Sequence, residues 1–307
     1  MSVALNFREA SAPSRTALSV KKNGYVNFIV SFDATEATQF VALKATSPYT
    51  FTPSMLAELV AWARNSRTQS KSPVRNRVLM SERPGIFSLG GDLAFFRDCI
   101  KRCDPKSLTD YALTAVDAIW ESISAGGPDD VISIALVQGE AQGGGFEAAL
   151  ASHVLIAERG TAFGFPEGLF GLFPGMGASA LLTARGSADL AGRLIGSARR
   201  YTAEELYSVG VVDFLAEPGF GLNALRSVCN DVDRERLLSL RARFGDIDKR
   251  HLIENVFDWV ELAMSLSAKH LRTMDFLILA QQKLQARRVP PSVRVIQAQA
   301  KKQEKMP

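Results

Sequence analysis

Residues 135–178 read ALVQGEAQGGGFEAALASHVLIAERGTAFGFPEGLFGLFPGMGA, and this stretch decides the fold. The apolar run that ends at Val137 is typical of a strand buried on both faces of a sheet. Three glycines follow, then FEAALAS, which indicates a helix, and then residues 154–157, which form another buried strand. This order of strand, glycine turn, helix and strand predicts an α/β domain.

Strands and helices also alternate on the N-terminal side of this stretch. Asn23-Gly24 lies between two β-prone runs and predicts a hairpin with a two-residue turn. Apolar residues at helical spacing predict helices over residues 54–66, from Leu93 to about Cys103, and over residues 108–124. We expect Asp92 to cap the second of these helices.

The C-terminal side changes to helices after Pro174. Thr202 and Glu205 have the spacing of a capping box, and most of the chain from Leu222 to about Arg287 has helical periodicity. The expected organisation is a flexible arm at 1–17, a core domain at 18–220, a helical region at 221–288 and a basic, flexible tail at 289–307.

Composition excludes several classes of protein. With 307 residues and a net charge of +4, the chain is only mildly basic, and no arginine-rich or aromatic-interleaved repeat indicates nucleic-acid binding. No apolar run reaches the ~18 residues of a membrane helix, and no secretory signal is evident. The three cysteines are too few for a disulfide framework and lack nearby histidines, so we expect a cytoplasmic protein without metal or cofactor.

Two glycine-rich turns have the composition of an anion-binding site. Leu89-Gly90-Gly91-Asp92 and Gly143-Gly144-Gly145 each precede a predicted helix. Unpaired N–H groups at helix starts can hold a developing oxyanion, so Gly91 and Gly144 are candidate donors. Taken alone, such turns are more often tight loops without a site.

Two glutamates occupy unusually apolar settings. Glu147 lies in the first turn of the predicted helix beside Phe146 and Ala148, and Glu167 follows Pro166 in the run GFPEGLF. Each one alone has the more common interpretation of a solvated or structural charge. Two carboxylates in different environments can, however, divide the work of acid and base.

Together, these features resemble the core of the crotonase (enoyl-CoA hydratase/isomerase) superfamily. The similarity covers about residues 77–216 and includes LGGD, the stretch quoted above and YTAEELYSVGVVD. It implies a crotonase-type (ClpP/crotonase-like) spiral of ββα units with a C-terminal helical region. It also implies an oxyanion hole at Gly91 and Gly144 and catalytic carboxylates at Glu147 and Glu167.

Four strings narrow the resemblance to the bacterial diffusible-signal-factor synthases: FSLGGDLAFF, IALVQGEAQGGGFEAAL, PEGLFGLFPGMGA and LRTMDFLILAQ. These enzymes dehydrate a 3-hydroxyacyl chain on acyl carrier protein and then cleave the thioester, which releases a cis-2-unsaturated fatty acid used in quorum sensing. The alternative is an enoyl-CoA hydratase/isomerase of fatty-acid metabolism without thioesterase activity. Glu140 departs from the family, which often has a small or neutral residue after this glycine.

The resemblance also predicts what the protein binds. The substrate is expected to be an acyl carrier protein or CoA thioester, with Met176, Trp259 and Leu277 around the acyl chain, although ordinary helix core explains each of them as well. The basic residues Arg97 and Lys101 are candidates for contact with an acidic carrier, and a solvated helix face is the other interpretation. A membrane sensor kinase is one candidate partner, and a homotrimer or hexamer is expected.

Overall fold

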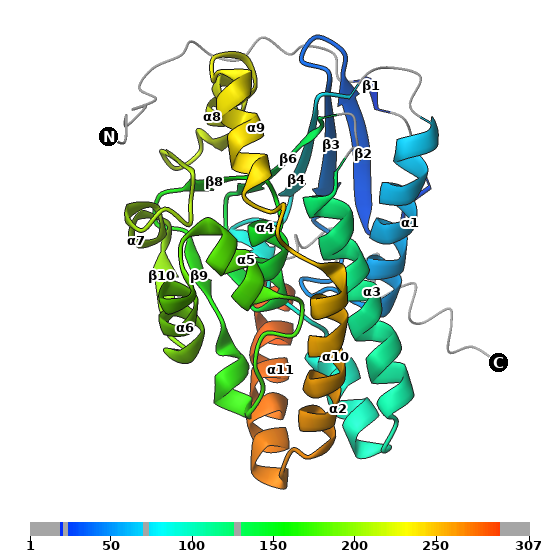
Figure 1. Cartoon of the computed structure of the whole chain (residues 1–307). Helices are drawn as coiled ribbons and strands as arrows, with labels where there is room; N and C mark the ends of the chain where they lie inside the picture. Colours follow the sequence, from blue (N-terminus) through cyan, green and yellow to red (C-terminus); the bar gives the residue numbers. More distant parts are fainter. Residues whose placement is uncertain (1–18, 21–23, 70–73, 126–129, 289–307) are drawn as a thin grey trace, which may run out of the picture.

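The computed structural model describes residues 19–20, 24–69, 74–125 and 130–288 (Figure 1). The predicted arm at 1–17 and tail at 289–307 lie outside the described residues. No helix in the described part has both the length and the apolar character needed to cross a membrane.

A seven-stranded sheet forms the centre of the molecule, in the order β1-β2-β3-β4-β6-β8-β11. The pairs β1–β2 and β2–β3 are antiparallel, and the remaining neighbours are parallel. The bounds are β1 (Ser19–Val20), β2 (Phe28–Asp33), β3 (Thr38–Leu43), β4 (Asn76–Ser81), β6 (Ile132–Val137), β8 (Val154–Glu158) and β11 (Phe214–Ala216).

A second sheet of four short strands has the order β10-β9-β7-β5. Its strands are β5 (Ile86–Ser88), β7 (Glu140–Gln142), β9 (Ala162–Gly164) and β10 (Arg200–Thr202). The strands β5, β7 and β9 each follow a strand of the large sheet and precede a helix, so the chain repeats a ββα unit. The predicted spiral of ββα units, with helices at the C-terminal end, is confirmed.

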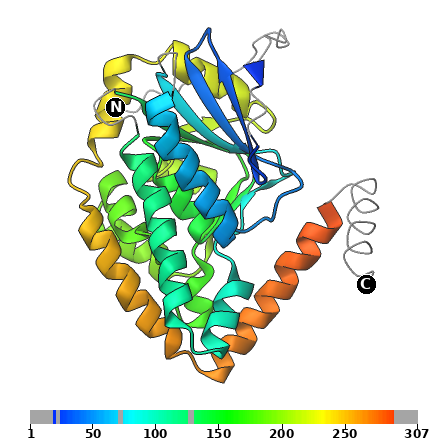
Figure 2. The same cartoon turned by 90° about the vertical axis from the view of Figure 1, so that its right-hand side faces the viewer.

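Helices cover both faces of the large sheet (Figures 1 and 2). Their bounds are α1 (Pro53–Gln69), α2 (Leu93–Lys101), α3 (Pro105–Ile123), α4 (Gly144–Leu150), the 3₁₀ helix η1 (Pro166–Phe170), α5 (Ala178–Arg185), α6 (Ala188–Gly196), α7 (Ala203–Ser208), α8 (Gly221–Asn230), α9 (Arg234–Ala242), α10 (Lys249–Met264) and α11 (Ala268–Arg288). In Figure 2, the C-terminal end of α11 points away from the rest of the molecule.

The strand β6 shows why its sequence is apolar throughout. Ile132, Ile134 and Leu136 join a core cluster with α8 and α9 on one face of the sheet. Ala135 and Val137 belong to the larger cluster on the other face, which includes α1, α3, α4 and α10. A strand covered on both faces needs apolar residues at every position.

Two predicted helix caps are confirmed. The side chain of Asp92 accepts a hydrogen bond from the N–H of Phe95 at the start of α2. Thr202 and Glu205 form the reciprocal capping box at the start of α7. These caps satisfy N–H groups that a helix leaves unpaired at its first turn.

The N-terminal strand pair forms, but the predicted register was wrong. A two-residue turn at Asn23-Gly24 would pair Val20 with Asn27, whereas Val20 pairs with Ser31. The reason is a tertiary contact, because the carboxylate of Glu58 in α1 accepts hydrogen bonds from the N–H groups of Val26 and Asn27 at 2.9 and 3.1 Å. Asn23 itself lies outside the described residues.

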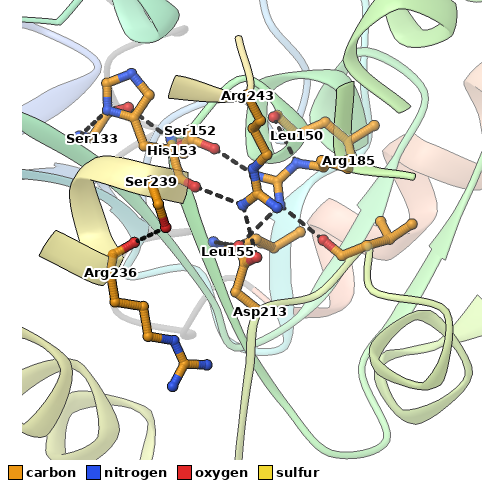
Figure 3. A network of polar contacts seen from close by, with 11 residues as sticks. Ser133, Leu150, Ser152, His153, Leu155, Arg185, Asp213, Arg236, Ser239 and Arg243 are labelled. Carbon is orange, nitrogen blue, oxygen red and sulfur yellow. Dashed lines mark hydrogen bonds and ion pairs between the residues drawn. The ribbon is translucent and has the colours of Figure 1, made fainter. Parts of the chain in front are cut away.

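A buried polar network fixes the far end of α4 (Figure 3). The guanidinium of Arg185, at the end of α5, donates to the carbonyl oxygens of Leu150 at 3.0 Å and of Ser152. The same guanidinium forms an ion pair with Asp213 at 3.0 Å, and Asp213 forms a second ion pair with Arg243 at 2.7 Å. This network ties the end of α4 to β8 and to the segment before β11.

Candidate active site

One cavity of about 270 Å³ lies between the small sheet, η1 and the helices α2, α3, α10 and α11. All seven residues that the sequence proposed for the site line it, from six separate segments of the chain: Gly91, Gly144, Glu147, Glu167, Met176, Trp259 and Leu277. The structure therefore brings together the residues on which the sequence-based hypothesis depends.

The two glycine turns meet at one wall of this cavity. The carbonyl of Gly90 accepts from the N–H of Phe51 at 2.8 Å, which anchors the first turn. A methyl group built on Gly144 would lie 3.5 Å from the nitrogen of Gly91, so the two amides are neighbours. Neither the Gly91 nor the Gly144 N–H donates a hydrogen bond to another residue in the described part of the chain, and both are available to a ligand oxygen.

Glu147 lies on α4 directly after these amides and is almost completely buried. Its Oε1 atom accepts hydrogen bonds from the N–H of Met176 at 2.8 Å and of Ala178 at 3.0 Å, at the start of α5. Burial raises the pKa of Glu147 to about 7, although these N–H groups favour the ionised form and lower it in part. The side chain is therefore held in one position and titrates near neutrality.

Glu167 approaches the cavity from η1 on the opposite side of the glycine turn. Its Oε2 atom is buried without a hydrogen-bond partner among the described residues. Burial, and then the charge of Glu147, raise the pKa of Glu167 to about 8. Both pKa values are raised from the ordinary range of a carboxyl group, so the pair can hold one proton and present an acid and a base together.

Gly143 makes the approach of Glu167 possible. Its φ of 51° lies in the left-handed region, and a Cβ at this position would be 2.2 Å from Oε1 of Glu167. Only glycine satisfies both requirements without strain. The sequence reveals the run of three glycines, but not that its first member borders a carboxylate.

The apolar wall of the cavity contains the three residues expected around an acyl chain. The Trp259 ring of α10 packs edge-on against Phe96 of α2, with 5.2 Å between ring centroids. The sulfur of Met176 would be 2.9 Å from a Cβ on Gly144, so this side chain lies beside the candidate oxyanion amides. Leu277 comes from α11, which closes the cavity on another side.

Several polar residues that line the cavity were not among the predicted site residues, and three of them make contacts that bear on the site. The Tyr111 hydroxyl donates to the carbonyl of Phe51 at 2.7 Å and so supports the first glycine turn. Gln281 of α11 donates to the carbonyl of Leu89 at 3.2 Å. Tyr111 adjoins the predicted apolar stripe of its helix, which was the signal available, whereas nothing local marks Gln281.

Arg200 is the third, and it pairs with Glu140 at 2.7 Å. The sequence identified Glu140 only as a departure from the family, without its partner on β10.

The basic residues of α2 have acidic neighbours within the chain. Arg97 pairs with Asp98 and with Asp275 of α11, each at 2.9 Å, and Lys101 lies 3.9 Å from Asp275. These contacts connect α2 to α11. Among the described residues, no group of three or more His, Cys, Asp or Glu side chains is arranged to hold a metal ion.

Comparisons with known proteins agree with this geometry. The model of the enoyl-CoA hydratase/isomerase family matches residues 40–225, more than half of the chain. The glyoxysomal fatty acid beta-oxidation multifunctional protein MFP-a of Brassica napus is 28% identical over 159 residues, which are 52% of this chain and 21% of that protein. The short-chain-enoyl-CoA hydratase of Clostridium acetobutylicum is 33% identical over 99 residues, 32% of this chain and 38% of that protein. The chain thus spans between a fifth and two fifths of these relatives.

Solved structures share the fold. Human mitochondrial delta3-delta2-enoyl-CoA isomerase superimposes with a TM-score of 0.70 and 18% identity, over 84% of this chain and 98% of that one. Pseudomonas aeruginosa DspI gives a TM-score of 0.55 and 24% identity, over 76% of this chain and 87% of that one.

Proposed function

The chain belongs to the enoyl-CoA hydratase/isomerase family, and we propose that it dehydrates a 3-hydroxyacyl thioester and then hydrolyses the thioester to release a cis-2-unsaturated fatty acid signal. The observation that carries this proposal is the position of two buried carboxylates, Glu147 and Glu167, beside the unpaired amides of Gly91 and Gly144. This arrangement supplies an acid, a base and a binding place for a carbonyl oxygen.

The first step uses all three of these elements. The thioester oxygen accepts from the N–H groups of Gly91 and Gly144, which stabilises the enolate formed when the α-proton leaves. One carboxylate takes that proton, and the other, protonated, gives a proton to the β-hydroxyl, which leaves as water. The product is the 2-unsaturated thioester, and the pair has exchanged its proton.

The two glutamates are suited to different parts of this step. The Oε2 atom of Glu167 has no partner among the described residues to compete with a substrate. We assign it to the α-proton. Glu147 is fixed by two N–H groups and holds the departing hydroxyl or water.

Hydrolysis uses the same amide pair. Water, deprotonated by one of the carboxylates, adds to the thioester carbonyl, and the tetrahedral oxyanion is stabilised by Gly91 and Gly144. The carbon–sulfur bond then breaks, and the thiolate takes up the proton. No additional group is required, so one site can perform both reactions in sequence.

The narrower assignment is supported by where the synthase-like strings fall. LRTMDFLILAQ covers residues 271–281 of α11, and this helix supplies Leu277 and Gln281 to the cavity. A resemblance outside the glycine turns thus falls on residues next to the proposed acyl chain. The thioester carrier is proposed to be acyl carrier protein or CoA, and a cytoplasmic homotrimer or hexamer with a sensor kinase as partner remains part of the proposal.

The second candidate function is hydration or isomerisation of an enoyl-CoA without thioester cleavage. The relatives named above favour it, because one is a short-chain-enoyl-CoA hydratase and the other a beta-oxidation protein. The same carboxylates and amides serve that chemistry, which omits only the attack of water on the carbonyl.

One experiment separates the two functions. The purified protein is incubated with 3-hydroxydodecanoyl acyl carrier protein, and the products are analysed by mass spectrometry. The synthase proposal predicts free dodecenoic acid with a cis double bond. Unsaturated product that stays bound to the carrier contradicts the thioesterase step and leaves the hydratase function. If Glu147→Gln and Glu167→Gln form no product, whichever reaction is observed takes place at this site.

A further inference from the structure

A second cavity of about 80 Å³ adjoins the candidate active site. It is lined by α1, α3, α4 and the strands β3, β4 and β6, and most of its lining side chains are apolar, among them Phe51, Leu56, Leu59 and Ile119. Met176 lines both cavities, so its side chain separates them.

The helix α3 forms a continuous wall along both spaces. Tyr111, Ala112 and Ala115 line the first cavity. Ala118, Ile119 and Ser122 follow on the next turns and line the second. Because residues three or four apart share one face of a helix, a ligand that follows this face from the glycine turns enters the second cavity.

Met176 is suited to act as a movable partition. Its backbone N–H donates to Oε1 of Glu147 at 2.8 Å, which holds the main chain in place. The buried side chain is unbranched and has three rotatable bonds, so it is the lining group between the cavities best suited to adopt another rotamer.

The far side of the second cavity is polar. Arg77 and Glu121 line it, and Arg64 of α1 lies 3.4 Å from Glu121 across the helices α1 and α3. A hydrocarbon chain is stabilised along the apolar part and is not stabilised against charged groups. The cavity therefore sets an upper limit on the length of an apolar ligand.

From these observations we propose that the second cavity receives the distal end of a long acyl chain once Met176 has turned aside. The inference rests on the proposed function for the identity of the ligand, a fatty acyl thioester. The site then prefers long chains such as dodecanoyl, whose ends reach the second cavity. Short chains such as butanoyl stay within the first cavity and gain nothing from it. Each buried methylene favours binding, so the preference grows with length until the polar end is reached.

Photoaffinity labelling tests this placement without depending on turnover. Dodecanoyl-CoA with a diazirine at the end of its chain is bound to the wild-type protein, irradiated, and the labelled peptides are identified by mass spectrometry. The inference predicts label on the peptide with Ala118, Ile119 and Ser122, or on α1 near Leu56 and Leu59. Label confined to α10 and α11 would overturn the inference. So would labelling that is not reduced by an excess of dodecanoyl-CoA without the diazirine.

A filled cavity provides the second test. Ala118→Leu places a larger side chain in the second cavity, and Ala184→Leu, at a partly buried helix position that lines neither cavity, is the matched control. We expect Ala118→Leu to lower kcat/KM at least tenfold for dodecenoyl-CoA and less than twofold for crotonyl-CoA, with no such difference in the control. Equal losses for both substrates would contradict the inference.

The two proposals fail in different ways. If the protein binds the photoaffinity ligand and is labelled on α3 but turns over no thioester, the proposed function is rejected and the second cavity remains an acyl-binding site. If the protein turns over thioesters of all chain lengths equally and is labelled only on α10 or α11, the proposed function stands and the inference is rejected.

Discussion

Glu147 and Glu167 differ in what surrounds each carboxylate, and the proposed function assigns them separate roles on that basis. Glu147 accepts two hydrogen bonds from backbone N–H groups, whereas Oε2 of Glu167 accepts none from the described residues. Both pKa values are raised by burial, to about 7 and about 8. A site built for stability alone would not hold two neighbouring acids in this condition, because burying them destabilises the fold.

The raised pKa of Glu167 makes a prediction about stability and pH. Between the pKa of the unfolded chain, near 4.5, and the folded value of about 8, the folded state binds more protons, so stability falls as pH rises. Glu167→Gln removes this loss. We expect the variant to be more stable than wild type by of the order of 1 kcal/mol or more at about pH 9, and by much less at about pH 5.

Urea unfolding at the two pH values measures this effect. If the free energies of unfolding of the variant and wild type differed by the same amount at both pH values, the pKa of Glu167 would not be raised on folding. That result would contradict the account of a buried acid.

Gly143 allows a second prediction at the scale of one residue. Gly143→Ala brings a methyl group against the Glu167 carboxylate and also strains a backbone with φ of 51°. Gly160→Ala is the matched control, since φ is 75° there and the added methyl meets nothing within 4 Å. We expect Gly160→Ala to lose about 1–2 kcal/mol of stability from the backbone. Gly143→Ala should lose more, because its ψ of −126° lies outside the left-handed helical region, and it alone should lose roughly 100-fold in kcat, as expected for a misplaced reacting group.

Chemical denaturation and steady-state kinetics on the same preparations check both parts. If the two variants lost activity equally, the close approach of Gly143 to Glu167 would have no functional meaning.

The residues of the site were more predictable than their supports. Order and spacing along the chain were enough to propose Gly91, Gly144, Glu147 and Glu167, and the structure places all four around one cavity. Tyr111 and Gln281 were missed because each acts on the carbonyl of a residue distant in sequence, Phe51 and Leu89. No local pattern encodes such a contact.

At the scale of elements, α11 is the helix whose placement matters most to the cavity. It contributes Leu277 and Gln281, and the ion pair between Arg97 and Asp275 joins it to α2. The pair is partly exposed, so its contribution is modest. Weakening this ion pair should therefore change KM for the substrate more than kcat.

Asp275→Asn tests this role of α11. We expect KM for a long-chain thioester to rise about two- to fivefold, the effect of an ion pair worth up to ~1 kcal/mol, with kcat little changed. Asp110→Asn breaks the exposed pair with Lys106 on α3 and serves as the control, with no expected change. A fall in kcat without a change in KM would place Asp275 in the chemistry and contradict its positioning role.

Elements with strong periodicity were predicted, whereas three of the very short strands were not. The helices α1, α2 and α3 and the strands β6 and β8 follow from apolar spacing. The strands β5, β7 and β10 have three residues each, too few for a pattern. The register of β1 and β2 failed because Glu58 of α1 holds the chain after the turn, and a turn motif contains no information about that helix.

At the scale of the whole molecule, the Arg185 network links the site to the rest of the fold. Arg185 is fully buried, and its contacts hold α4, which carries Glu147, to the strands β8 and β11. Burial lowers the pKa of Arg185 to about 10, so it remains charged and needs its acidic partner.

Removing this charge should destabilise the entire domain. Arg185→Leu removes one of the two cations paired with Asp213 and leaves the carbonyl oxygens of Leu150, Ser152 and Val211 without their buried donor. We expect a loss of about 3–5 kcal/mol in the free energy of unfolding. Arg250→Leu, which breaks an exposed pair with Asp248, should cost less than about 1 kcal/mol. Unfolding in guanidinium chloride measures the free energy of unfolding of both variants. Similar losses would show that the buried network stabilises the fold no more than an exposed ion pair does.

The interconversion of a 3-hydroxyacyl thioester and its 2-enoyl thioester tests the central claim most directly, since both candidate functions require it. Its rate is measured for wild type, Glu147→Gln, Glu167→Gln and the control Glu158→Gln, which replaces a buried glutamate that does not line the cavity. The account predicts a loss of roughly 100- to 10,000-fold in each of the first two variants and a near wild-type rate in the control. A rate within tenfold of wild type in either Glu147→Gln or Glu167→Gln would contradict it.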